Sequence, residues 1–192
     1  MPAPNPAALD FLLTRRSRPA KTLGLPVPDR AALGPLLQAA ARSPDHGKLE
    51  PWRLIVLERG ALQRLAALAA ARGPALGLPP EKVEKGVRQY ADAHLAVAVV
   101  ASPKPSDTIP VIEQHLSAGA VCLQLLNAAL AAGWGANWLT GWASHDAEFC
   151  ATGLGLAPRE FVAGLIHIGS ETSAPPERPR PDLDRIVTWV AE

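Results

Sequence analysis

The sequence has little excess charge of either sign. Its 192 residues include 19 Lys and Arg and 18 Asp and Glu, which gives a net charge of +1 at pH 7. Proteins that bind nucleic acids usually carry a basic patch or stripe that attracts the phosphate backbone. The balanced charge therefore argues against DNA and RNA as partners.

Cysteine is scarce, and no long uninterrupted apolar run is present. Cys122 and Cys150 are the only cysteines and are too far apart for a C-x-x-C motif, which excludes a disulfide scaffold and favours a reduced, cytoplasmic setting. Residues 1–6 lack the charged and apolar regions of a signal peptide. The longest apolar segment, residues 116–132, is shorter than the roughly 20 residues that span a bilayer, so no membrane association is expected.

The common signatures of protein-based catalysis are also missing. The five histidines lack metal-ligand spacing, so no metal site is expected. There is no G-x-G-x-x-G dinucleotide fingerprint and no G-x-S-x-G nucleophile elbow. No catalytic residue is therefore assigned to the protein itself. If the chain is an enzyme, a bound cofactor is expected to carry the chemistry.

Hydrophobic periodicity predicts a mixed order of helices and strands in one domain, residues 1–192. The order is not a regular βαβα alternation, so the expected fold class is α+β. A proline-rich tail, residues 171–181, is expected to run extended over a surface. The predicted helices are 7–15, one from 27–29 to Ser43-Pro44, 62–71, 81–91, 111–132 and one starting in 144–148; the strands are 53–58, 95–101, 134–139 and 161–168; the loops are 73–80 and 103–110.

Arg15, Arg16 and Ser17 follow the first predicted helix and offer two forked guanidinium groups and a hydroxyl. This combination matches the geometry of a phosphate. Basic residues at a helix carboxyl end also complement the helix dipole, so a solvated helix end is the alternative.

A second polar cluster lies in the turn before the strand predicted at 53–58. It contains Asp45, His46, Lys48 and Glu50, and ligand-binding groups are often found on such loops. His46 is of most interest because its side chain titrates near neutral pH. An ordinary exposed turn is the alternative.

Two apolar features of the sequence also bear on function. The helix predicted at 111–132 has few polar residues, which indicates burial in the core or against a second subunit. Trp134, Trp138 and Trp142 cluster around glycines, as suits a flat aromatic ligand. Core packing and interface burial, which tryptophan serves well, are the alternative and are slightly favoured.

Together, Arg-Arg-Ser, Ser-Pro-Asp-His with Glu-Pro-Trp, Glu-Gln-His-Leu-Ser-Ala-Gly at 113–119 and Gly-Trp-Gly-Ala-Asn-Trp-Leu-Thr-Gly at 133–141 resemble the nitroreductase family. The similarity is greatest to its short-chain, minimal subgroup and runs from about Phe11 to Val190. It implies an α+β sandwich with a central, mainly antiparallel sheet, assembled as an intertwined homodimer. Two FMN molecules would lie at the subunit interface.

The resemblance also implies roles for individual residues. The phosphate and ribityl chain would be held from one subunit, and the ring would be lined by the strand that precedes Gly141, whose backbone amide or that of its neighbour would face flavin N5. A second subunit would complete each site; Glu50 departs from the glutamine that relatives often have there. The implied FMN-binding residues are Arg15, Arg16, Ser17, Trp138, Leu139, Thr140, Arg178 and Arg180 from one chain, with His46 and Glu50 from the other.

The function implied by the resemblance is that of an FMN-dependent NAD(P)H oxidoreductase. Hydride would pass from a nicotinamide through the flavin to a nitroaromatic, a quinone or a similar small molecule in a ping-pong sequence. One alternative is a dimer that carries or senses FMN without efficient turnover. Another is a purely structural role for the apolar helix and the tail.

Overall fold

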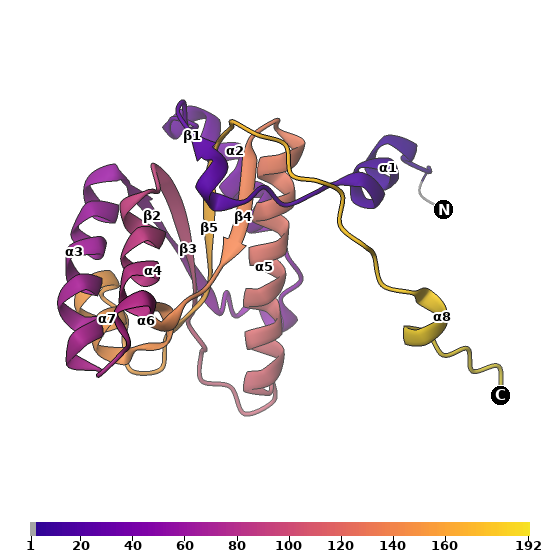
Figure 1. Ribbon diagram of the computed structural model, residues 1–192. Coiled ribbons are helices and arrows are strands. Elements are labelled where there is room, and N and C mark those ends of the chain that lie inside the picture. The colour runs from indigo at the N-terminus through magenta and orange to yellow at the C-terminus, as the bar shows by residue number, and fades with distance from the viewer. Residues whose placement is uncertain (1–2) are drawn as a thin grey trace.

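A computed structural model describes residues 3–192 (Figure 1). Its centre is a five-stranded sheet in which every pairing is antiparallel. β5 (Phe161–Glu171) lies between β3 (Leu95–Ala101) and β4 (Gly135–Leu139), and β2 (Trp52–Glu58) lies beyond β3. The two-residue β1 (Leu23–Gly24) pairs with the carboxyl end of β5.

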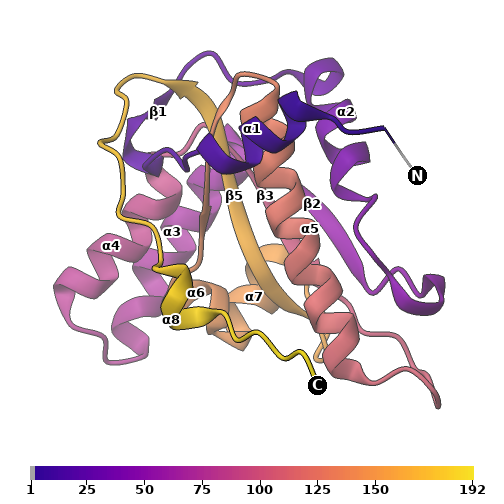
Figure 2. The ribbon, with the colours of Figure 1, turned by 90° about the vertical axis from the view of Figure 1, so that its right-hand side faces the viewer.

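Helices cover both faces of this sheet. One layer contains α2 (Arg30–Ala40) and the long α5 (Val111–Ala131). The other contains α3 (Arg59–Ala75), α4 (Pro80–Ala91), α6 (Trp142–His145) and α7 (Ala147–Leu154). Two short helices, α1 (Pro6–Thr14) and α8 (Leu183–Ile186), lie away from the layered body at the two ends of the chain (Figures 1 and 2).

The central strand β3 explains why both layers are needed. All seven of its residues are buried. Because side chains alternate along a strand, Ala96, Ala98 and Val100 pack into the α3/α4 layer. Leu95, Val97 and Val99 pack into the α2/α5 layer. The sheet therefore has an apolar core on each face, which confirms the α+β sandwich.

The boundaries of most elements agree with the sequence prediction, with three corrections. Residues 73–80 are not all loop, because α3 continues through Pro74 to Ala75. Gly73 is buried there against Val83 of α4, and this packing keeps the last turn helical. Strand β5 extends to Glu171 because β1 supplies it with a pairing partner. The helix expected from Ser144 is two helices, with Asp146 capping the second.

α4 approaches α6 closely at a glycine. The indole of Trp142 lies against Gly86, and its Nε1 donates a hydrogen bond to the carbonyl of Lys82 at 3.1 Å. A Cβ at position 86 would collide with the indole nitrogen and carbon atoms. The absence of a side chain at Gly86 thus sets the position of α4 over the sheet.

Gly86→Ala is therefore expected to lower the free energy of unfolding by about 1–3 kcal/mol, the usual effect of overpacking. Urea denaturation monitored by circular dichroism measures this value. Gly60→Ala in α3 is the matched control, because nothing lies within 4 Å of its added Cβ. That control should be neutral or stabilising by up to about 1 kcal/mol. Equal effects at the two positions would refute the close contact.

An ion pair joins β2 to the segment before β5. Arg53 donates two hydrogen bonds of 2.8 Å to the carboxylate of Glu160. These bonds from Arg53 lower the pKa of Glu160 to about 2. Because its folded pKa is depressed, Glu160 stabilises the fold above its ordinary pKa of 4.5, and the contribution is lost as the pH falls toward 2.

Glu160→Gln is expected to lower the free energy of unfolding by about 1–2 kcal/mol at pH 7, because a charge-assisted bond is lost. The difference from the unsubstituted protein should shrink as the pH falls from 4.5 toward 2. Urea titrations at pH 7 and pH 3 provide the comparison. A difference that does not depend on pH would contradict the assigned carboxylate.

Candidate functional site

The predicted phosphate-binding residues form a compact cationic cluster just after α1. Arg15 is the residue that ends this helix, and its Nη2 donates to Ser17 Oγ at 2.8 Å. Arg16 Nη1 donates to the backbone carbonyl of Ser17 at 3.2 Å. Ser17 thus holds both guanidinium groups in place. The Nε atoms of both arginines are buried, and neither has a hydrogen-bond partner within residues 3–192.

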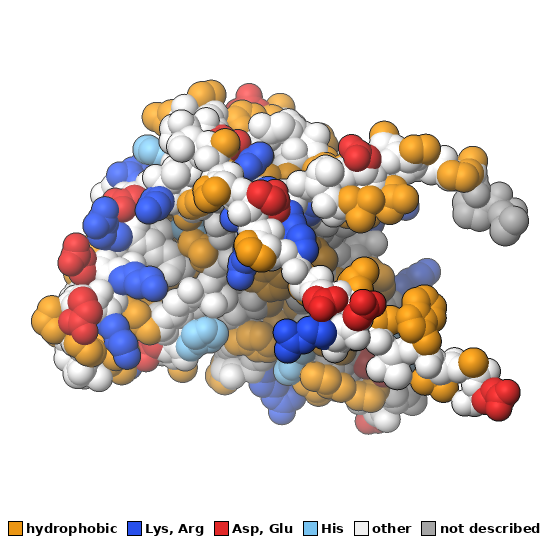
Figure 3. Space-filling view, turned by 45° about the vertical axis from the view of Figure 1, so that its right-hand side comes forward, with side chains coloured by type: hydrophobic (Ala, Val, Ile, Leu, Met, Phe, Trp, Pro, Cys, Tyr) orange, Lys and Arg blue, Asp and Glu red, His pale blue; other side chains and the backbone are white. Residues whose placement is uncertain are grey.

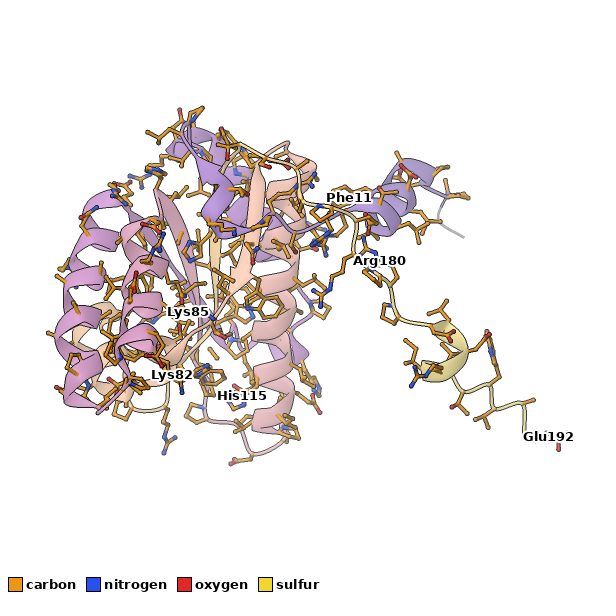
Figure 4. The ribbon with its side chains drawn as sticks, in the orientation of Figure 1. Phe11, Lys82, Lys85, His115, Arg180 and Glu192 are labelled. Atoms are coloured by element: carbon orange, nitrogen blue, oxygen red, sulfur yellow. The ribbon has the colours of Figure 1, made fainter. Side chains whose placement is uncertain are left out.

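The tail adds a third arginine to this cluster. Burial lowers the pKa of Arg15, and the positive charges of Arg180 and Arg16 lower it further, so the three groups are close enough to repel one another. Arg180 also forms an ion pair of 2.8 Å with Glu177 (Arg180 is labelled in Figure 4). Three clustered cations with two buried donors left free are suited to an anion with several oxygen acceptors.

A small cavity adjoins these arginines. Its volume is about 290 Å³, and it lies at the start of β4, where Gly135 and Trp134 contribute to its wall. Arg15 and Arg16 line its other side together with Phe11 of α1. Arg18 and Glu171 also line the cavity and form an ion pair of 3.1 Å, so Arg15 and Arg16 are the cations there that can bind an anion such as a phosphate.

A larger cavity of about 700 Å³ lies between α4 and the sheet. It is lined by Leu139 and Thr140 at the end of β4, by His167 of β5, and by Gln89 and Lys85 of α4 (Lys85 is labelled in Figure 4). Small-molecule sites have volumes of about 300–1,000 Å³. The cavity is therefore large enough for an aromatic ring system.

The two cavities lie along the same edge strand. Gly135 lines the small one and Leu139 the large one, and four residue steps along a strand cover about 13 Å. The segment after Ser17 follows β4 between them, since Arg18 N–H donates to the Ala136 carbonyl at 2.8 Å. Asn137 Nδ2 donates to the Arg18 carbonyl at 2.6 Å. The arrangement suits an elongated ligand with a phosphate at one end and a ring at the other.

The side chain of Trp138 does not line either of the two cavities. It alternates with Leu139 along β4, so its side chain lies on the other face of the sheet, against Gly164 and Cys122. Leu139 and Thr140 are in the large cavity, whereas the Trp138 side chain packs toward α5. Its contact with a ligand ring remains a prediction that the observed side-chain position does not favour.

The turn that carries His46 and Glu50 is well ordered by local contacts. The Asp45 carboxylate accepts hydrogen bonds from the backbone of Leu49 at 3.2 Å and of Glu50 at 2.8 Å. Lys48 and Glu50 both have positive φ angles, of 54° and 47°. Such conformations are uncommon for residues with side chains and are frequent at functional sites.

This turn is not near the arginine cluster of the same chain. His46 Nδ1 lies 2.7 Å from Glu113 Oε2, at the amino end of α5. The arginine cavity is lined by Leu130 and Gly133, at the carboxyl end of that helix. The 21 residues of α5 span about 30 Å, so one chain does not bring the two halves of the predicted site together (Figure 2).

Large apolar side chains are exposed on α5 and at both ends of the chain. On α5, Leu116 is 66% exposed, and Ile112 and Leu123 share its face. On the tail, Trp189 is 92% exposed. Figure 3 shows both ends of the chain projecting from the body with hydrophobic side chains along them. The other exposed apolar residues of these ends are Leu9, Leu12, Leu13, Leu183, Ile186, Val187 and Val190.

The sequence prediction missed part of the large cavity. Lys21, Lys85, Gln89 and His167 line it and were not among the predicted site residues. His167 could have been noticed in the sequence, because a histidine within an otherwise apolar strand is unusual. The residues of α4 had none, since nothing in the sequence places that helix over β4. Within the described part of the chain, no group of three potential metal ligands occurs.

The fold is an α+β sandwich, and the two cavities lie along β4, the smaller one beside the arginine cluster. Residues 14–170 match the model of the nitroreductase family. A Haemophilus influenzae protein that carries an NAD(P)H nitroreductase name is 35% identical over 165 residues, which cover 85% of this chain and 88% of that protein. The chain therefore belongs to the nitroreductase family, and the resemblance drawn from its motifs is confirmed.

Other relatives agree with this assignment. YdjA of Escherichia coli K12, which also has an NAD(P)H nitroreductase name, is 29% identical over 163 residues, or 85% of this chain and 87% of YdjA. A nitroreductase-like protein from Bacillus cereus has a TM-score of 0.79 at 20% identity and full coverage of both chains. NfnB of Sphigopyxis sp. strain HMH, titled an FMN and NADPH-dependent nitroreductase, has a TM-score of 0.72 at 18% identity, covering 96% of this chain and 99% of NfnB.

Proposed function

We propose that this protein is an FMN-dependent NAD(P)H oxidoreductase. The proposal is supported by the order of the arginine cluster, β4 and the large cavity, in which a phosphate, a chain and a ring would follow one another. The names of the curated relatives and of NfnB support this function.

The residues present fit FMN at its charged end. Arg15, Arg16 and Arg180 would bind the phosphate, and the buried Nε atoms of the first two are free to donate to it. Ser17 holds the arginines in position. Arg178 precedes Arg180 in the same tail and lies outside the 14–170 family match, so its role is proposed from the resemblance alone.

The ring would occupy the large cavity beside Leu139 and Thr140. When bound, FMN supplies a centre that accepts hydride from a nicotinamide and donates it to a second substrate. The protein contributes placement and electrostatics, since its two thiols are unsuited to nucleophilic attack. Burial raises the pKa of Cys122 to about 12 and that of Cys150 to about 11, which keeps both protonated.

A second copy of the chain would complete the site. In a two-fold symmetric dimer, each subunit uses the same surface. If the exposed faces of two α5 helices pack antiparallel, the amino end of one lies beside the carboxyl end of the other. His46 and Glu50 of the second chain would then approach the arginine cluster. The exposed apolar residues of α1, α5 and the tail would be buried in the same interface.

The proposed reaction is ping-pong reduction of nitroaromatics, quinones or similar electron-poor small molecules, because both substrates would use one cavity in turn. The test is steady-state oxidation of NADPH and of NADH by the FMN-loaded protein at several concentrations of a nitroaromatic and of a quinone. Parallel double-reciprocal lines are expected. Intersecting lines would contradict the ping-pong sequence. FMN binding without turnover of any acceptor would instead favour a carrier or sensor.

A further inference from the structure

Two buried side-chain nitrogens, in residues that line the large cavity, have no hydrogen-bond partner within residues 3–192. They are Nε2 of Gln89, on α4, and Nε2 of His167, on β5. An unpartnered polar atom in the interior is destabilising, because it has lost its hydrogen bonds to water. Because both residues line the cavity, a ligand bound there is in a position to supply the missing partners.

His167 is held rigidly. It lies in the middle of the sheet, paired with Ala96 of β3 on one side and Asn137 of β4 on the other, and it is 3% exposed. Its neighbour Asn137 is already bonded to the backbone of Arg18 and faces the same layer. His167 is therefore a fixed polar group on the sheet side of the cavity, which Leu139 also lines.

Burial also settles the charge of this histidine. It lowers the pKa of His167 to about 4, so the imidazole is neutral at pH 7. A neutral imidazole has one nitrogen that donates and one that accepts. Gln89 Nε2 can only donate. In the tautomer that carries its proton on Nδ1, His167 accepts at Nε2 while Gln89 donates, and the two residues then complement a ligand edge that has a hydrogen-bond donor next to an acceptor.

The isoalloxazine of FMN has such an edge, because its N3–H lies between two ring carbonyls. We propose that His167 Nε2 accepts a hydrogen bond from this N3–H while Gln89 donates to an adjacent carbonyl. The inference rests on the proposed FMN function and adds two residues to the site, of which His167 comes from the centre of the sheet. It makes His167 a determinant of how the ring is oriented over β4.

The test compares the binding of FMN and of N3-methyl-FMN, which lacks this donor. Dissociation constants are measured from the quenching of flavin fluorescence, with the full-length protein and with His167→Leu. The unsubstituted protein should bind FMN more tightly than the methylated analogue by at least about tenfold. His167→Leu should bind FMN about 3- to 10-fold more weakly and should lose the matching part of the discrimination.

His167→Leu is a suitable variant because it removes the unpartnered nitrogen and retains apolar packing. Its apparent melting temperature without FMN should equal or exceed that of the unsubstituted protein. His167→Asn, which retains a hydrogen-bond acceptor, should recover part of the discrimination. Gln89→Leu should weaken the binding of FMN and of N3-methyl-FMN by the same factor, because Gln89 would donate to a ring carbonyl that both flavins possess.

The outcomes separate this inference from the function on which it depends. If the unsubstituted protein binds neither flavin, both the inference and the proposed function are wrong. If it binds FMN, but discriminates against N3-methyl-FMN as strongly after His167→Leu as before, the inference alone is overturned. Equal binding of both flavins by the unsubstituted protein would likewise overturn the inference and leave the proposed function standing.

Discussion

Replacing Arg15 and Arg16 together with alanine is expected to remove most of the preference of the protein for FMN over riboflavin. The two flavins differ only in the phosphate, so the ratio of their dissociation constants isolates the phosphate contacts. Both arginines have a buried Nε without a partner within residues 3–192, and both are positioned by Ser17. The unsubstituted protein should bind FMN at least about 100-fold more tightly than riboflavin, because charge-assisted hydrogen bonds contribute about 1.5–3 kcal/mol each.

In the double variant the affinity for FMN should fall by at least about 100-fold, whereas the affinity for riboflavin should change little. Removing two like charges beside Arg180 relieves repulsion, so the variant should fold. Arg30→Ala, at an exposed position in the first turn of α2, is the matched control and should leave both dissociation constants unchanged. An equal loss of affinity for the two flavins would show that the arginines do not bind the phosphate.

A second large change is expected from substitutions on the exposed face of α5. Leu116→Glu combined with Leu123→Glu should convert a dimer into monomers and reduce bound FMN to a small fraction of its level in the unsubstituted protein. Both side chains face outward, so the substitutions should leave the monomer fold intact. Placing two carboxylates from each chain in one two-fold interface is strongly unfavourable, because each would lose its hydration.

Light scattering after size-exclusion chromatography gives the mass, and absorbance at visible wavelengths gives the FMN content. Leu76→Glu, at an exposed position just after α3, is the control and should change neither. A variant that is monomeric and still retains FMN would refute the proposal that His46 and Glu50 of a second chain complete the site. A variant that remains dimeric would show that α5 is not the interface.

Much of the fold could be predicted because local chemistry and tertiary packing agree. The helix before Arg15, the strand at 95–101 and the long helix from Val111 all have the boundaries expected from their periodicity, within about a residue. Prediction failed where packing outweighed local preference. Pro74 indicates a loop in the sequence, but the contact between Gly73 and Val83 keeps its turn helical.

Some residues of the candidate site could also be predicted from the sequence, and others could not. The arginine cluster was predictable because its members are adjacent in sequence and share a phosphate-binding geometry. Its proximity to Arg180 was expected from the family resemblance, and the lowering of the Arg15 pKa by the Arg180 charge supports it. Gln89 and His167 were not predictable as a pair, because only the placement of α4 over the sheet brings residues so distant in sequence to one cavity.

The alternation of side chains in β4 separates two residues of the predicted ring contact. Motif similarity assigned Trp138 and Leu139 to the same ring contact, although consecutive residues in a strand lie on opposite faces. Leu139 lies in the large cavity, and Trp138 lies against Cys122 of α5. The two-residue period of a strand is enough to separate them, so the motif should be interpreted one face at a time.

The proposed activity requires that the chain bind FMN in a site where the flavin accepts hydride from a nicotinamide. An anaerobic titration of the purified, FMN-loaded protein with NADPH and with NADH, followed by its visible absorbance, measures this step. We expect a yellow protein whose flavin absorbance bleaches with at least one of the two nicotinamides and returns when a nitroaromatic or quinone is added. A protein that cannot be loaded with FMN, or whose bound flavin is reduced by neither nicotinamide, would contradict the proposed activity.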